Sequence, residues 1–177
     1  MATKSTHTKS VAKGQPQGEV RANLEKIVVN FGVGRLRAMP NFEDKVVPEL
    51  ISTIAAITGQ APAARKAKKS VASFKLREGE VVGYQVTLRR ARMEAFLRRL
   101  VAVVFPRVKD FRGIDVRNVD EHGNLNVGFR DQFVFPEINL EKSRISFGVQ
   151  VTCVTKSKNR DAAIAFYRSV GVPLKSS

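Results

Sequence analysis

The chain has 177 residues, 43% of them hydrophobic, and its 31 Lys and Arg against 16 Asp and Glu give a net charge of +15. This length and composition predict one domain with one core, and the charge indicates an acidic partner, with nucleic acid ahead of an anionic membrane surface. The longest apolar run, residues 100–105, is far short of a membrane span of ~18 residues, and the single cysteine excludes an internal disulfide and a cysteine-cluster zinc site.

The positive charge is concentrated in one part of the chain. Residues 65–112 contain fourteen Lys or Arg against four Asp or Glu, whereas residues 113–177 are nearly neutral, with nine basic and seven acidic residues. Such dense charge repels itself unless a polyanion neutralises it. Apolar residues are interleaved with the basic ones at strand and helix spacing, so the segment belongs to a folded frame. The pattern therefore predicts a shaped phosphate-binding surface.

The N-terminal part of the chain divides into a leader and a first strand. Residues 1–22 are expected to form a basic, flexible leader and residues 23–177 a single folded domain, because the leader has almost nothing apolar to bury. A basic arm that becomes ordered on RNA is the alternative reading of the leader. The first strand is predicted over residues 24–33, where four apolar residues alternate onto one face: Ile27, Val29, Phe31 and Val33.

A helix is expected over residues 41–58, with Asn41 as N-cap and Gly59 as its C-terminal stop. Pro48 should kink this helix or delay its start. Its buried stripe consists of residues at helical spacing, namely Phe42, Val46, Val47, Leu50, Ile51, Ile54 and Ile57. A short strand over residues 61–67 and a loop over residues 70–80 should follow.

The remaining elements alternate between strands and helices. We expect strands at residues 81–88 and 125–129, the second paired in a hairpin with a strand near residues 116–120. A helix over residues 91–105 should end at Pro106. Apolar and polar residues alternate again from Phe147 to Cys153. Cys153 itself is interpreted as a small hydrophobic residue buried in the core. Asn159 should cap a last helix that Gly171 ends, with four residues facing inward: Ala163, Phe166, Tyr167 and Val170.

These elements predict an α+β fold, with a largely antiparallel sheet, helices packed on one face and the other face open for RNA. Strand alternation places short polar side chains on the open face: Lys26, Asn30, Gln85, Thr87, Gln150 and Thr152. Groups of this kind, edged by Lys and Arg, suit the sugar–phosphate backbone and groove edges of a nucleic acid. An ordinary solvated face is the alternative, which the neighbouring basic cluster makes less attractive.

Six segments resemble, in their order, the ribosomal protein L5 family of the bacterial large subunit. They are KIVVNFGVG (26–34), ITGQAP (57–62), RKAKKSVASFKLREGEVVG (65–83), VTLRRARMEAFLRRL (86–100), PRVKDFRGI (106–114) and GFRDQFVFPEI (128–138). The resemblance covers most of residues 26–138 and is looser beyond Ile138. Two departures stand out: the family's usual N-terminal helix is replaced by the basic leader, and its usual Gly after TLR is replaced by Arg90, which together with Ala91 should raise helix propensity.

The resemblance implies a structural protein of the cytoplasmic ribosome, with an organellar ribosome left open. It implies 5S rRNA and large-subunit rRNA as partners, together with other 5S-binding ribosomal proteins. The expected rRNA-binding residues are Asn30, Gln60, Arg65, Lys66, Lys68, Lys69, Thr87, Arg89, Arg90 and Arg92. The family's P-site tRNA contact falls on the basic loop, at Ser73, Phe74, Lys75, Leu76 and Arg77. A small-subunit head protein should meet the less basic half across the subunit interface.

Two other classes of function were weighed. A ribonuclease needs a carboxylate cluster for metal or a histidine acid–base pair, but His7 and His122 lie in the leader and in a turn, and the carboxylates are scattered. A membrane-surface binder needs a basic amphipathic helix, but the apolar stripe of residues 91–105 is expected to be buried in the core. We therefore expect no enzyme, no catalytic residue, no cofactor, no metal and no membrane partner.

Overall fold

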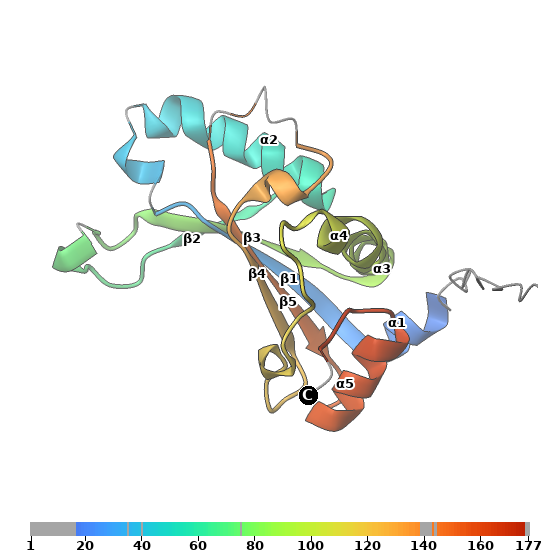
Figure 1. Ribbon diagram of the computed structural model, residues 1–177. Coiled ribbons are helices and arrows are strands. Elements are labelled where there is room, and N and C mark those ends of the chain that lie inside the picture. The colour runs from blue at the N-terminus through green and yellow to red at the C-terminus, as the bar shows by residue number, and fades with distance from the viewer. Residues whose placement is uncertain are drawn as a thin grey trace, which may run out of the picture.

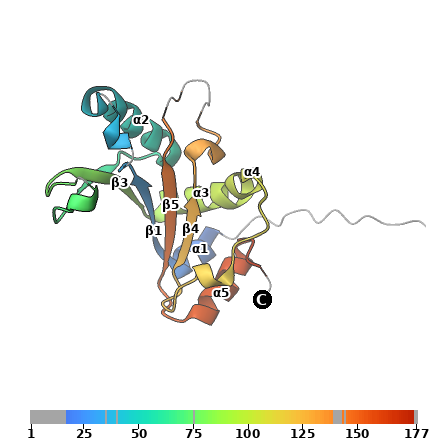
Figure 2. The ribbon, with the colours of Figure 1, turned by 60° about the vertical axis from the view of Figure 1, so that its left-hand side comes forward.

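The computed structural model describes residues 17–34, 36–39, 41–74, 76–138, 143 and 145–175. Within these residues, five antiparallel strands form one sheet in the order β2–β3–β1–β5–β4. The longer helices pack against one face of this sheet, and the β2–β3 hairpin projects from the body (Figure 1; Figure 2). The predicted α+β fold with a largely antiparallel sheet is confirmed.

The regular elements have the following bounds. The strands are β1 Leu24–Gly32, β2 Ala63–Lys66, β3 Val81–Leu88, β4 Leu125–Phe129 and β5 Gly148–Thr155. The α-helices are α1 Gln17–Asn23, α2 Val47–Thr58, α3 Arg90–Arg99, α4 Phe105–Arg107 and α5 Arg160–Ser169. Short 3₁₀ helices are η1 Leu36–Ala38, η3 Ala72–Phe74, η5 Val116–Asn118 and η6 Gln132–Val134, and π segments are η2 Phe42–Val46 and η4 Leu100–Val104. Residues 1–16 of the expected leader lie outside the described residues.

Strand β1 lies at the centre of the sheet, between β3 and β5. Its Ile27 stands opposite Leu88 on β3 and Cys153 on β5, and its Val29 stands opposite Val86 and Val151. All six of these side chains are almost completely buried. The apolar positions that alternate along β1 therefore meet apolar positions of both neighbours, and the core forms on the face that they share.

Aromatic side chains join the helices to the edge strand β4. The Phe129 ring of β4 lies 6.2 Å from Phe105 and 5.8 Å from Phe135, centroid to centroid, and Phe135 stacks at 6.3 Å on Phe96 of α3. Rings at these distances add attraction to the area that they bury. Arg99 of α3 also donates to the backbone oxygen of Ile57, which ties α3 to the end of α2.

The helix predicted over residues 41–58 forms in two parts, η2 followed by α2. Pro48 lies in the first turn of α2, where its missing N–H costs nothing, so the expected delay of the helix is confirmed. Asn41 is the N-cap residue of η2, as predicted, but it has a left-handed conformation (φ 56°) and makes no side-chain capping bond. Ile51 is 39% exposed, which removes it from the predicted stripe. Gly59 ends α2 as predicted, at φ 69°.

Pro106 does not end the second helix, contrary to the prediction. The π segment η4 lies just before it, and the Phe105 N–H donates to the Leu100 oxygen, five residues back. The hydrogen-bond register therefore changes immediately ahead of Pro106, so its missing N–H falls in the first turn of α4 rather than inside a regular helix. The chain stays helical to Arg107.

The strand predicted near residues 116–120 is instead the 3₁₀ helix η5. The Asp115 side chain accepts a hydrogen bond from the Arg117 N–H at 2.9 Å, which stabilises a turn and competes with strand pairing. Within this described segment, only Val119 makes a bridge, to Leu125. Helix α5 follows its prediction, since the Asn159 side chain accepts from the N–H groups of Asp161 and Ala162 and the four inward residues are buried.

Among the described residues, no helix is long and apolar enough to cross a membrane.

The buried Tyr167 hydroxyl provides a test of the packing of α5. It accepts from the Leu125 N–H at 3.2 Å, and its one hydrogen can be donated to the backbone oxygen of Gly123 or of Cys153, each at 3.1 Å. Tyr167→Phe removes these buried hydrogen bonds and leaves backbone groups less well satisfied, so we expect the free energy of unfolding in urea to fall by about 1–3 kcal/mol. Tyr84→Phe is the control, because the Tyr84 hydroxyl has no partner among the described residues. Equal losses in both variants contradict the assignment.

Candidate nucleic-acid interface

The face of the sheet opposite the core carries the six polar residues that strand alternation predicted: Lys26, Asn30, Gln85, Thr87, Gln150 and Thr152. Asn30 of β1 stands opposite Gln85 on β3 and opposite Gln150 on β5, so three amides form one row across the sheet. Five of the six are half-buried and Gln150 is exposed. Their position on the open face is confirmed.

Hydrogen bonds orient part of this face and leave part of it free. Arg65 Nε donates to Gln85 Oε1 at 2.8 Å, and Thr152 Oγ1 donates to Asn126 Oδ1 at 2.8 Å. The Asn30 amide and the Thr87 hydroxyl have no partner among the described residues. Two of the predicted RNA contacts therefore keep their donors and acceptors available to a ligand.

A hollow of about 570 Å³ runs over the open face, and a row of glycines forms part of its floor. Gly32 of β1 stands opposite Gly83 on β3 and opposite Gly148 on β5. A Cβ at Gly83 would lie 2.8 Å from the Phe31 oxygen, so the protein's own packing excludes a side chain there, whereas a Cβ at Gly32 would meet nothing within 4 Å. Packing within the protein does not require a glycine at position 32. The bare backbone there therefore leaves room for a ligand.

Gln60 lies beyond the end of α2 rather than on the sheet. The left-handed Gly59 turns the chain, and the Gln60 oxygen accepts from Thr58 Oγ1 at 2.9 Å. The Gln60 side chain accepts from Arg92 Nη1 at 3.1 Å. The structure therefore pairs Gln60 with Arg92, another predicted site residue, while Asn30 and Thr87 share the sheet face.

The predicted basic run lies along the edge strand β2 and the start of its hairpin. Its four side chains are all exposed: Arg65, Lys66, Lys68 and Lys69. Arg65 stands opposite Gly83 and so points over the glycine row on the open face. An edge strand rich in Lys and Arg resists pairing with another strand, yet presents its charge to a polyanion.

A second basic group surrounds the junction of β3 with α3. Arg89 lies 3.4 Å from Glu25, which also contacts Lys26 at 3.3 Å, and the Lys26 hydrogen bond, followed by Arg89, lowers the pKa of Glu25. Arg90 is exposed and adopts a left-handed backbone conformation, φ 52°, that strains any side chain other than glycine. Arg90 is the first residue of α3, but at this φ glycine is favoured over arginine, so Arg90 does not add helix propensity as expected.

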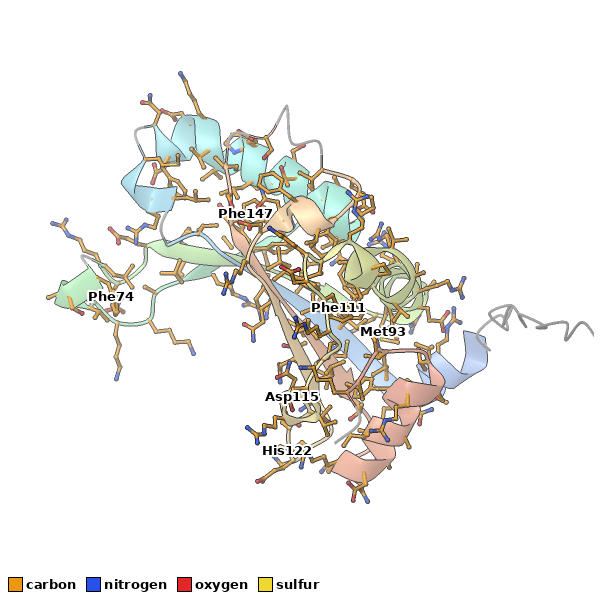
Figure 3. All side chains as sticks on the ribbon, in the orientation of Figure 1. Phe74, Met93, Phe111, Asp115, His122 and Phe147 are labelled. Carbon is orange, nitrogen blue, oxygen red and sulfur yellow. The ribbon has the colours of Figure 1, made fainter. Side chains whose placement is uncertain are left out.

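The segment expected to be an irregular loop is an ordered extension of the β2–β3 hairpin. Val71 bridges to Leu76 around the 3₁₀ turn η3, and the Glu78 N–H donates to Ser70 Oγ at 2.9 Å. Phe74 is 80% exposed at the tip and points away from the body (Figure 3). Leu76 is half-buried, Ser73 and Arg77 are exposed, and Lys75 lies outside the described residues.

The base of the hairpin is fixed by Glu80. Its carboxylate accepts from the Arg77 N–H at 2.9 Å and from the Arg37 side chain, and these bonds, with that of Arg77 first, lower the pKa of Glu80. The sequence analysis did not single out Arg37 or Glu80. Opposite charges 43 residues apart give no local signal, and only the fold brings them together.

Comparison with known proteins shows the relationship directly. A family profile described as "Ribosomal protein L5" matches residues 21–77, and a second profile, which describes the C-terminus of the same ribosomal protein family, matches residues 81–174. The chain belongs to the ribosomal protein L5 family. The two profiles meet inside the β2–β3 hairpin, so both contribute strands to the one sheet.

Curated relatives agree with the family profiles. The chain is 47% identical to large ribosomal subunit protein uL5 of Fusobacterium nucleatum over 152 residues, 86% of this chain and 81% of that protein. It is 43% identical to the uL5 proteins of Halothermothrix orenii and Onion yellows phytoplasma, over 85% and 86% of this chain and 82% of each relative. The protein is thus a non-enzymatic, rRNA-binding constituent of the large subunit of a bacterial-type, cytoplasmic ribosome.

The strain at Arg90 generates a prediction that separates stability from RNA binding. Arg90→Gly relieves the left-handed conformation but adds freedom to the unfolded chain, so we expect a net gain of about 0.5–1 kcal/mol in the free energy of unfolding. The same change removes a cation, so affinity for large-subunit rRNA should fall. Its salt dependence should flatten by roughly 0.7–0.9 if this arginine neutralises one phosphate.

Arg90→Lys is the matched control, because it keeps both the charge and the strained conformation. It should resemble the wild type in urea unfolding and in filter binding over a salt series. A glycine variant that is no more stable than the wild type contradicts the strain, and one that binds rRNA equally well contradicts the phosphate contact.

Proposed function

We propose that the open sheet face holds 5S rRNA in the large subunit, with the two basic groups beside it neutralising phosphates. The observation that carries this proposal is the coincidence of the unpaired Asn30 and Thr87 groups with a bare glycine row, next to the exposed cations of β2 and the start of its hairpin. Membership of the family supports it, since the same residues carry the resemblance.

The chemistry of the face suits a folded RNA more than a base sequence. A-form RNA displays 2′-hydroxyls and base edges in a wide, shallow minor groove, which side chains on a nearly flat sheet can approach. Short amides and hydroxyls bond to either donors or acceptors, so the row at Asn30 can match sugar and groove edges. Lys and Arg at the margin set register through phosphates without reading bases.

The hairpin supports a separate contact with P-site tRNA. An 80% exposed Phe74 beside the exposed Arg77 offers a surface for a ribose together with a cation for its phosphate. Phe74 does not pack back on the core. A contact made through sugar and phosphate is indifferent to which tRNA is bound, as a P-site contact has to be.

The less basic half, residues 113–175, is proposed to meet a small-subunit head protein across the subunit interface. Near-neutral charge favours a protein over RNA for most of this half. Other 5S-binding ribosomal proteins are expected to adjoin the same RNA. Support for these two partners comes from the family resemblance, and they are proposed on that basis.

Single substitutions on the proposed 5S rRNA surface test the proposal. Asn30→Ala, Gln60→Ala and Thr87→Ala should each weaken 5S rRNA binding about fivefold, or more where the partner is a phosphate, because each removes roughly 1–3 kcal/mol of hydrogen bonding. Ser52→Ala is the control, since Ser52 is exposed on α2, on the side of the helices. Gel-shift titrations at fixed salt in which all three variants bind like the wild type contradict the proposal.

Gly32→Val tests the same surface by adding bulk instead of removing a bond. A β-branched residue favours a strand and meets no atom of the protein at its Cβ, so thermal stability should be kept. Binding of 5S rRNA should nevertheless fall at least tenfold, because the new side chain occupies the hollow. Unchanged binding by a stable Gly32→Val variant would exclude close approach of RNA to the glycine row.

The hairpin tip is tested by changing Phe74 and Arg77 to Ser together. We expect 5S rRNA binding within twofold of wild type, and faster release of deacylated tRNA from the P site of reconstituted ribosomes. Glu78→Ser is the control within the same hairpin, because Glu78 is exposed and only its backbone N–H bonds to Ser70. Loss of 5S rRNA binding with normal tRNA retention would show that the hairpin contacts 5S rRNA and not tRNA, which contradicts the proposal.

A further inference from the structure

A second basic concavity lies far from the hairpin tip, at the end of the molecule marked by Asp115 in Figure 3. It measures about 580 Å³, and six charged side chains line it: Asp115, Arg117, Arg160, Asp161, Arg168 and Lys175. The short helix η5 contributes Asn118 to the hollow on the sheet and Arg117 to this pocket. The two concavities are therefore separate but share one short helix.

Three segments distant in sequence build this pocket, and backbone hydrogen bonds fix their arrangement. The Ile114 N–H donates to the Pro173 oxygen, and the Lys175 N–H donates to the Ile114 oxygen, both at 2.8 Å. Gly113 allows this approach, because a Cβ there would lie 3.1 Å from the Pro173 oxygen, and its φ is 93°. Lys175 is thereby held beside η5 and α5.

Arg160 joins the first turn of α5 to η5. Its Nε donates to the Val119 oxygen and its Nη2 to the Val116 oxygen, each at 3.2 Å. These bonds use two of the five guanidinium donors and fix the plane of the group. A guanidinium oriented in this way, with donors to spare, is prepared for an oxyanion.

The two carboxylates of the pocket stabilise a turn and a helix end, and among the described residues they form no ion pair with its cations. Asp115 accepts from the Arg117 N–H at 2.9 Å, and Asp161 lies in the first turn of α5, where the helix dipole favours a negative charge. The ion pairs of the described residues engage none of the four cations in this pocket. Four positive groups thus face two negative ones in a half that is nearly neutral as a whole.

We propose that this pocket binds the phosphates of an RNA segment other than the one on the sheet face. Three guanidinium groups line it, one from η5 and two from α5, which suits bidentate contact with phosphodiester oxygens. The apolar lining is limited to the half-buried Val116 and Ile164, so the pocket offers no deep anchor for a protein side chain. Both surfaces can be occupied at once, which lets the protein clamp two RNA segments. This inference rests on the proposed function only because that function identifies the RNA on the sheet face as 5S rRNA.

The test uses the preformed complex of the protein with 5S rRNA and a labelled, 16-base-pair RNA duplex of arbitrary sequence. The pocket variant combines Arg117→Gln, Arg168→Gln and Lys175→Gln, all at exposed positions, and spares Arg160 because it anchors η5. The control variant removes three exposed cations elsewhere, by Arg112→Gln, Arg130→Gln and Lys158→Gln.

We expect the pocket variant to bind the duplex at least tenfold more weakly, with a salt slope lower by roughly 0.7–0.9 for each phosphate that it no longer neutralises. The control variant should stay within twofold of wild type. Equal binding by pocket variant and wild type overturns the proposal, as does an equal loss in the control. Displacement of the labelled duplex by polyglutamate at a lower concentration of charge than unlabelled duplex requires assigns the pocket to a protein and also overturns the proposal.

Failure of the wild-type protein to bind 5S rRNA would contradict the proposed function and not this inference. In that event the same duplex titration is made on the free protein, with the same two variants. The difference between pocket and control variants then decides the proposal.

Discussion

The open face of the sheet depends on the register of β1 between its two neighbours. Because β1 is paired along both edges, the alternation of its side chains fixes which face of the whole sheet is apolar. A slip of one residue would bury Lys26 and Asn30 and expose Ile27 and Val29, so the register that secures the core also presents the polar row. The alternation of apolar and polar side chains along β1 thus determines both the stability of the core and the polar surface proposed for binding.

Around that sheet, charge and shape are supplied by different parts of the fold. The central strands provide short polar groups and bare glycine backbone, while the cations lie at the margins, on edge strand β2 and at the start of α3. Glu25 holds one of these cations, Arg89, in place, and Glu80 pairs with Arg37 of η1 at the base of the hairpin. The strained backbone of Arg90 indicates that a cation at that corner is kept at a cost in stability.

Local patterns in the sequence were sufficient for much of this arrangement. Period-two alternation predicted the bounds of β3 and β4, and the Asn159 cap predicted the start of α5, because these signals lie within a few residues of each other. The glycine row could not be predicted, since Gly32, Gly83 and Gly148 become neighbours only through strand pairing. The side-chain bond of Asp115 turned an apparent strand into η5, and the π segment before Pro106 altered a helix end, both through interactions that hydrophobic spacing does not encode.

Lysine acylation footprinting of the complex with 5S rRNA tests the central claim most directly. Lys26 lies on the open face, whereas Lys45 in η2 and Lys109 after α4 are exposed on the side of the helices. The open-face account predicts that 5S rRNA protects Lys26, together with Lys66, Lys68 and Lys69, and leaves Lys45 and Lys109 as reactive as in the free protein. Protection of Lys45 and Lys109 with Lys26 still fully reactive would contradict it.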